Sequence, residues 1–149
     1  MNKKEYFTLK KMVLEDELSN NEQSYLRIEE EVKSSTSSFE VEKLRSHNKD
    51  VEKIAALVFS LLRRLSRVER QIVEGENEFE YVMKKKRDKL VLQLEDAKTL
   101  KIFIEKRTKD ILKMIKMNLG DSVCEQFEQF VNVKIKLIAK IKMVEENLR

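Results

Sequence analysis

The chain of 149 residues has no proline and no tryptophan, and it has only two glycines and one cysteine. Compact β-rich and α/β domains need many tight turns, for which glycine and proline supply much of the chemistry. Their scarcity excludes these fold classes and favours long helices. Charged residues make up 39% of the chain, a composition typical of long helices and coiled coils. The net charge of +4 is too small to indicate nucleic-acid binding.

The chain also lacks the residue patterns that catalysis and metal binding need. Cys124 has no partner for an internal disulfide, and neither Cys124 nor the single His47 has the companions of a zinc or iron site. No glycine-rich phosphate loop and no G-x-S-x-G motif is present. We therefore expect no enzyme, no metal and no cofactor. Cys124 is interpreted as a small packing residue rather than a reactive thiol.

Long apolar runs are absent as well. No stretch of 18 apolar residues occurs, and the N-terminal residues lack the apolar run of a signal peptide. The lone cysteine suits a reducing compartment. We therefore expect a soluble, unexported, cytoplasmic protein without membrane insertion. Whether the chain is cut from a larger protein stays open.

Apolar side chains in the first part of the chain recur in alternating steps of four and three residues, as in a coiled coil. They predict a helix over about 5–33, which carries seven acidic residues between 14 and 32 against Arg27 alone. Five hydroxyl residues follow at 34–38 and weaken helix, because their side chains compete for backbone hydrogen bonds. They predict a solvated linker or hinge, and phosphorylation there is the alternative.

The same spacing predicts a long central helix over about 50–117. Phe79 lies seven residues beyond Ile72, so the apolar stripe stays in phase across Gly75, and a weakened continuous helix is preferred to a turn. Such a helix is about 100 Å long at about 1.5 Å per residue. Gly120 suits a helix C-cap and predicts a break at 118–121. Ser122 and Glu125 then form a capping box for a last helix over 122–149.

A stripe of two apolar residues in seven buries too little surface for an isolated helix. The partner must come from another chain or from this chain folding back, and on a rod of this length we predict a dimer. Lys101 and Thr108 at seam positions favour one specific register. The predicted dimer seam consists of Ile54, Val58, Val68, Ile72, Leu90, Leu94, Ala97, Ile104, Ile111, Ile115, Phe127, Phe130, Leu137 and Ile141.

Basic residues gather in two places. Residues 84–109 contain ten lysines or arginines against four acids, and four arginines lie between 63 and 70. By charge alone, the preferred interpretation is a solvated face that complements the acidic first helix. The alternative is a docking surface for an acidic partner helix or for phosphate. Nucleic-acid binding lacks support, because aromatic residues are not interleaved with the basic ones.

Residues 60–69 have the sequence SLLRRLSRVE, and residues 93–101 have the sequence QLEDAKTLK. Both stretches resemble the C-terminal domain of the Shroom cytoskeletal proteins. Shorter segments in the same order are also similar to that family, namely 14–16 with 20–21, 42–45, 50–53, and 127–131 with Lys134. The match covers nearly the whole chain. The combination is specific, whereas each segment alone is a generic coiled-coil fragment.

The resemblance implies an all-α, elongated, segmented coiled coil that forms an antiparallel homodimer. It further implies binding to the coiled coil of Rho-associated kinase, which places the kinase on apical actin, activates non-muscle myosin and constricts epithelial cells at apical junctions. The kinase-binding surface of the family maps onto Ser60, Leu61, Leu62, Arg63, Arg64, Leu65, Arg67, Lys86, Arg87, Lys89, Gln93, Glu95, Asp96, Lys98 and Lys101.

Two positions depart from the family pattern. Arg63 stands where members commonly have glycine, and the loop usually found near Gly75 is short. These departures bear on side-chain details more than on the mode of binding. The second functional hypothesis is a purely structural dimerising rod without a kinase partner.

Overall fold

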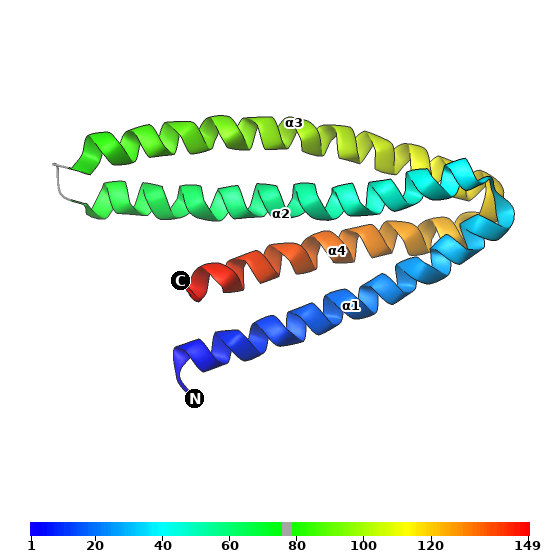
Figure 1. Ribbon diagram of the computed structural model, residues 1–149, viewed down its shortest axis with the longest axis horizontal. Coiled ribbons are helices and arrows are strands. Elements are labelled where there is room, and N and C mark those ends of the chain that lie inside the picture. Colours follow the sequence, from blue (N-terminus) through cyan, green and yellow to red (C-terminus); the bar gives the residue numbers. More distant parts are fainter. Residues whose placement is uncertain (76–78) are drawn as a thin grey trace.

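Four long helices make up the computed structural model, which describes residues 1–75 and 79–149 (Figure 1). They are α1 (Lys3–Ser35), α2 (Ser38–Glu74), α3 (Glu80–Leu119) and α4 (Asp121–Asn147). No strand occurs in the described part of the chain, so the predicted all-α class is confirmed. Asn2 begins α1 with a capping box, in which its side chain accepts from the Glu5 backbone nitrogen at 2.8 Å.

The connection between α1 and α2 is shorter than the predicted linker 34–38. Thr36 ends α1, and its hydroxyl donates to the Val32 carbonyl at 2.7 Å. Ser37 begins α2, because its hydroxyl accepts from the Glu40 backbone nitrogen at 3.3 Å. The hydroxyl residues thus cap two helices in succession. As a result α2 begins at Ser38, well before the expected start near residue 50.

The predicted continuous helix over 50–117 is wrong. Helix α2 ends at Glu74, Gly75 has extended backbone angles (φ −83°, ψ 163°), and α3 begins at Glu80. The part of the prediction that falls on 76–78 lies outside the described residues. The constant phase of the apolar stripe across Gly75 did not distinguish one continuous helix from two helices. Two helices that fold back on each other also need matching stripes. Folding back buries both stripes, a gain that a continuous helix in one chain cannot make.

The helices form two antiparallel pairs that meet at one end of the molecule (Figure 1). Helices α2 and α3 form the longer pair, and α1 and α4 form the other. The α1–α2 and α3–α4 connections both lie at the shared end, where all four helices pack into a bundle. The expected rod of about 100 Å is therefore replaced by helices of 27 to 40 residues, the longest about 60 Å.

Gly120 makes the sharp turn between α3 and α4. Its backbone angles of φ 92° and ψ −179° belong to a region that essentially only glycine adopts, so the predicted break falls here. Helix α4 begins at the next residue, Asp121, and has no side-chain cap. The expected capping box of Ser122 and Glu125 is therefore not formed, because the chain is already helical at Ser122.

Three clusters of buried apolar side chains hold the molecule together. The largest fills the shared end and includes Tyr25, Val32, Leu44, Ile115 and Phe127. A second lies between α2 and α3 and joins Val58, Leu61 and Val68 to Leu90, Leu94 and Ala97. A third joins Leu14 of α1 to Leu137, Ile141 and Val144 of α4. The helices thus form by packing of their apolar stripes.

The predicted dimer seam is covered within one chain. Its residues belong to these clusters or pack against them, and all are buried or half-buried. Of the two sources for a partner, folding back of the same chain is the one found in this structure. The dimer was predicted because a rod of this length was expected to have no partner within its own chain. That assumption is wrong, and the homodimer stays a prediction.

Candidate interaction surface

The two stretches that carry the predicted kinase-binding residues lie on neighbouring helices. Residues 60–67 belong to α2, and residues 86–101 belong to α3. Leu61 of the first stretch and Leu94 and Ala97 of the second lie in the same buried cluster. The fold therefore brings together two stretches that are about twenty residues apart in sequence, on the two sides of one apolar seam.

Within the α2 stretch, the apolar residues are mostly turned inward. Leu61 is 3% exposed, and Leu65 is half-buried against the cluster between α2 and α3. Both side chains therefore stabilise the pair rather than stand free for a partner. Leu62 is 37% exposed and is the apolar side chain of this stretch that reaches solvent.

The basic residues of the α2 stretch face the end of α4. Arg63, Arg64 and Arg67 are half-buried, whereas charge alone favoured a solvated face. Arg67 donates from Nη1 to both carboxylate oxygens of Glu146, at 3.2 and 3.4 Å. The solvated face is therefore not found at these three arginines, because folding back places α4 against them.

The polar side chains of the α3 stretch, apart from Arg87, are exposed to solvent. Arg87 is half-buried, and its guanidinium donates to the Asp88 carboxylate at 3.1 and 3.2 Å. Lys101 lies 3.5 Å from Glu105, an exposed pair one turn away that contributes little stability. The exposed members of the predicted site on this helix are Lys86, Lys89, Gln93, Glu95, Asp96, Lys98 and Lys101.

An apolar groove lies beside the long pair, where α2, α3 and α4 come together. It encloses about 500 Å³ and is lined by Val58 and Phe59 of α2, Ile104 of α3 and Ile135 of α4. Lys101, at the end of the predicted kinase-binding stretch, lies at this groove. The position of α4 was not available from sequence spacing, so sequence analysis missed the groove.

A polar cluster lies among the apolar side chains of the shared end. The side chain of Lys134 is 2% exposed, and its Nζ donates to Asn48 Oδ1 at 2.8 Å. Nζ also lies 2.7 Å from Glu22 Oε1, a charge contact without hydrogen-bond geometry. Asn48 Nδ2 in turn donates to Glu22 Oε2 at 3.2 Å. These three residues tie α1, α2 and α4 together at one level.

A second buried polar contact joins α2 to α3. His47 is fully buried, and its Nε2 lies 2.8 Å from the Thr108 hydroxyl, which itself donates to the Ile104 carbonyl. The hydroxyl proton is thus already used, so His47 donates from Nε2 and leaves Nδ1 without a proton or a partner. Burial, together with the nearby Arg107, lowers the pKa of His47 to about 4.

A third polar contact joins α1 to α2. The Tyr25 hydroxyl donates to Glu29 Oε1 at 2.7 Å, and Arg45 donates to the same oxygen at 2.9 Å. Burial alone would raise the pKa of Glu29, but the hydrogen bonds from Arg45 and Tyr25 outweigh it and lower that pKa. Burial and the bond to Glu29 raise the pKa of Tyr25. Glu29 therefore stays ionised and holds α1 to α2.

Cys124 is a packing residue in the structure. It lies half-buried against the cluster of the shared end, and its Sγ donates to the Leu112 carbonyl at 3.4 Å. Burial raises the pKa of the thiol, which disfavours the reactive thiolate. No group of three or more metal-ligating side chains occurs among residues 1–75 and 79–149.

Long amphipathic helices, buried polar contacts between them and a charged outer face are typical of a helical protein-interaction domain. Residues 3–149 match the sequence model of the Apx/Shroom domain ASD2. The chain belongs to this family, so the resemblance found in the sequence is confirmed. Membership supports a cytoskeletal protein-interaction domain of the Shroom type.

Individual relatives support the same assignment. The chain is 35% identical to Protein Shroom of Drosophila melanogaster over 73% of its length, and 31% identical to human Protein Shroom4 over 82%. It is 30% identical to mouse Protein Shroom4 over 90% of its length. The chain spans only 7 to 9% of the length of these relatives. A membrane-spanning segment is not found in the helices that the structure describes.

Proposed function

We propose that this domain binds the coiled coil of Rho-associated kinase through the pair formed by α2 and α3. The observation that carries the proposal is that both stretches resembling the binding surface of the family lie side by side on these helices. The exposed basic side chains of α3 offer a surface for an acidic partner helix. Charge complementarity of this kind speeds association and excludes wrong partners.

The wider role follows from this binding. A domain that holds the kinase and belongs to an actin-associated protein brings the kinase to actin, where it activates non-muscle myosin and drives apical constriction. The proposal places the protein in the cytoplasm, at the cytoskeleton of apical junctions in epithelial cells. It assigns no catalytic step to this chain.

Charge reversal on α3 tests the proposal. We expect the triple variant Lys86→Glu, Lys89→Glu, Lys98→Glu to weaken binding of the kinase coiled coil by about tenfold or more, because it creates like-charge contacts with an acidic partner. All three side chains are exposed, so helix content should not change. Binding is measured by titration calorimetry, and helix content by circular dichroism.

The same helix provides a matched control. Lys106, Lys109 and Lys113 are also exposed and lie outside the predicted stretch, so their reversal changes the net charge equally. Equal loss of affinity in both triple variants would mean that the effect comes from the net charge alone. Retained binding in the first variant would favour the second candidate, a purely structural cytoskeletal domain. Reversal of Arg63, Arg64 and Arg67 is a less clean test, because Arg67 also pairs with Glu146.

We also propose the homodimer that the resemblance implies. If α2 and α3 of one chain separate, α2 can pack on α3 of a second copy, and α3 on its α2. Each apolar stripe then meets the same partner residues as within one chain. Light scattering coupled to gel filtration should give a mass twice 17.8 kDa for the purified chain at micromolar concentration. A mass of 17.8 kDa would mean that the chain covers its own seam and works as a monomer.

A further inference from the structure

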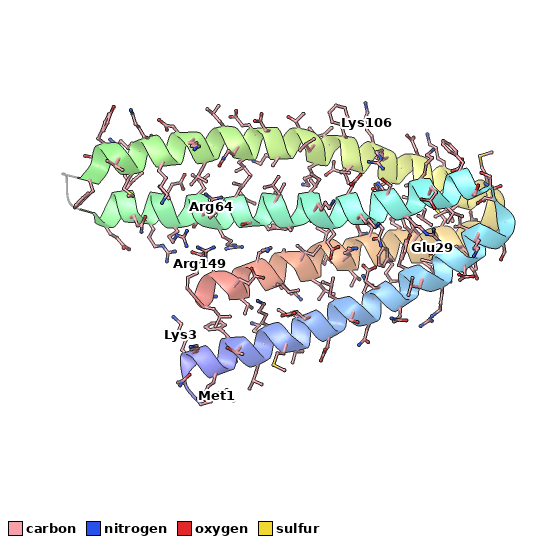
Figure 2. The ribbon with its side chains drawn as sticks, in the orientation of Figure 1. Met1, Lys3, Glu29, Arg64, Lys106 and Arg149 are labelled. Atoms are coloured by element: carbon pink, nitrogen blue, oxygen red, sulfur yellow. The ribbon has the colours of Figure 1, made fainter. Side chains whose placement is uncertain are left out.

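A small notch lies where α2 passes the C-terminal end of α4. It is lined by Ser60, Arg63 and Arg64 of α2, by Lys142, Glu145 and Glu146 of α4, and by Arg149 just beyond the end of α4. Arg64 and Arg149 lie in the space between these two helices (Figure 2). The residues come from parts of the chain about eighty positions apart, so only the fold assembles the notch.

The two carboxylates of the notch are already matched. Glu146 pairs with Arg67 at 3.2 Å and with Arg149 at 3.4 Å. Glu145 pairs with Lys142 at 3.3 Å and with Lys11 at 3.7 Å. Each carboxylate thus has two cations around it, so neither Arg63 nor Arg64 is needed to balance its charge.

Arg63 and Arg64 have no carboxylate within ion-pair distance in the described part of the chain. Six basic side chains therefore surround two acidic ones at this place. The local excess of positive charge selects for an anion.

Arg63 supplies the second observation. Its Nε is buried and has no hydrogen-bond acceptor, although a buried guanidinium nitrogen without an acceptor is costly. The notch encloses about 20 Å³, the space of one water-sized atom. A space of this size admits a single oxygen of a ligand, and Arg63 and Ser60 are among the residues that line it.

We propose that this notch binds the phosphoryl group of a phosphorylated side chain on a partner protein. A phosphoryl group carries a charge near −2 and three strong acceptor oxygens, which matches a site with two arginines in excess. One of these oxygens enters the notch beside the Arg63 guanidinium, and the other two stay at its rim. Arg64 and Arg149 lie at the rim and contribute charge.

The shape of the notch favours a protein side chain over a lipid surface. One enclosed oxygen on a flexible side chain can enter between two helices, whereas a flat bilayer meets the outer faces of both. The proposal goes beyond kinase docking, since it requires only a phosphorylated partner. Failure of kinase binding would leave it intact, and its own test contains no kinase.

The test uses the whole chain and a short peptide with one phosphoserine between alanines, beside the same peptide with unmodified serine. Nitrogen-15 NMR follows the Arg63 Nε–H signal directly. We expect a saturable shift of this signal with the phosphopeptide and none with the unmodified peptide at equal ionic strength. Inorganic phosphate should compete. A response equal to that of added chloride would overturn the proposal.

Two variants localise the site, and a third is the control. Arg63→Gln should weaken phosphopeptide binding about tenfold. Arg149→Gln should weaken it severalfold while leaving the α2 surface unchanged, which keeps the test valid if Arg63→Gln unfolds. Arg70→Gln is matched to the first variant, because Arg70 is exposed and lies seven residues further along α2. Equal affinity in all three variants would contradict the assignment.

A lipid competitor is the final arm. Vesicles of phosphatidylcholine with phosphatidylserine are sedimented with the wild-type chain and with Arg63→Gln. We expect no difference between the two proteins. Vesicle binding that depends on Arg63, without binding of the phosphopeptide, would overturn the proposal in favour of a membrane surface.

Discussion

Replacing Glu22 with alanine is expected to lower the free energy of unfolding by about 3 kcal/mol, the cost of leaving a buried charge without its counter-ion. Lys134 is almost wholly enclosed, and Glu22 is the one carboxylate within ion-pair distance of it in the described residues. The two oxygens of Asn48 and the Phe130 ring remain beside the ammonium group, which keeps the loss at the lower end for a buried pair. Urea unfolding at pH 7, followed by circular dichroism, measures the change.

The partner variant should behave differently. Lys134→Met removes the buried cation and keeps most of the side-chain volume, so we expect a smaller loss of stability than for Glu22→Ala. The Glu22 side chain is 33% exposed, so water reaches part of the carboxylate, although Oε1 is buried and loses its counter-ion. Adding Lys134→Met to Glu22→Ala should recover most of the loss. Equal losses in the two single variants would mean that the pair itself stabilises the bundle.

The second large effect is a loss of stability as the pH falls from 6.5 to 4. The pKa of His47 is about 4 in the folded chain and 6.5 when the ring is free. Between these values the unfolded chain binds a proton that the folded chain does not, so stability declines as the pH falls, by about 3 kcal/mol in total. The charged groups that face the ring are Arg107 and Asp50, which form an ion pair at 2.9 Å.

A variant that cannot titrate isolates this contribution. His47→Gln can still donate to the Thr108 hydroxyl but carries no ionisable group. Unfolding in urea at pH 6.5 and at pH 4 gives the loss for each protein, and the carboxylates contribute equally to both. We expect the loss to be about 3 kcal/mol smaller in the variant. The same loss in both proteins would mean that His47 is protonated in the folded state.

Sequence patterns could predict the elements that depend on local information. The period of the apolar side chains marked the seam residues from Ile54 to Ile141, and all of them are buried or half-buried. Gly120 marked the turn before α4, because few other residues adopt its backbone angles. The segments similar to the Shroom family led to the correct family, since their order along the chain is specific.

The pairing of the helices could not be predicted in the same way. A stripe from Ile54 to Ile72 needs an apolar partner, but its period is identical whether that partner is the same chain or another one. Gly75 did not decide between a continuous helix and a turn, because one glycine costs only about 1 kcal/mol in a helix. The packing of α2 on α3 outweighs that small preference and makes the chain fold back.

The sequence by itself determined the helical class, the burial of the stripes and the family, because each of these follows from residue type and spacing along one helix or from ordered similarity. The tertiary structure decided what the charged residues do. Arg67 became the partner of Glu146, and Lys134 became a buried cation beside Glu22, because folding back brings α4 against α2 and α1. Interactions between groups about eighty or more residues apart depend on that approach, and no local pattern encodes it.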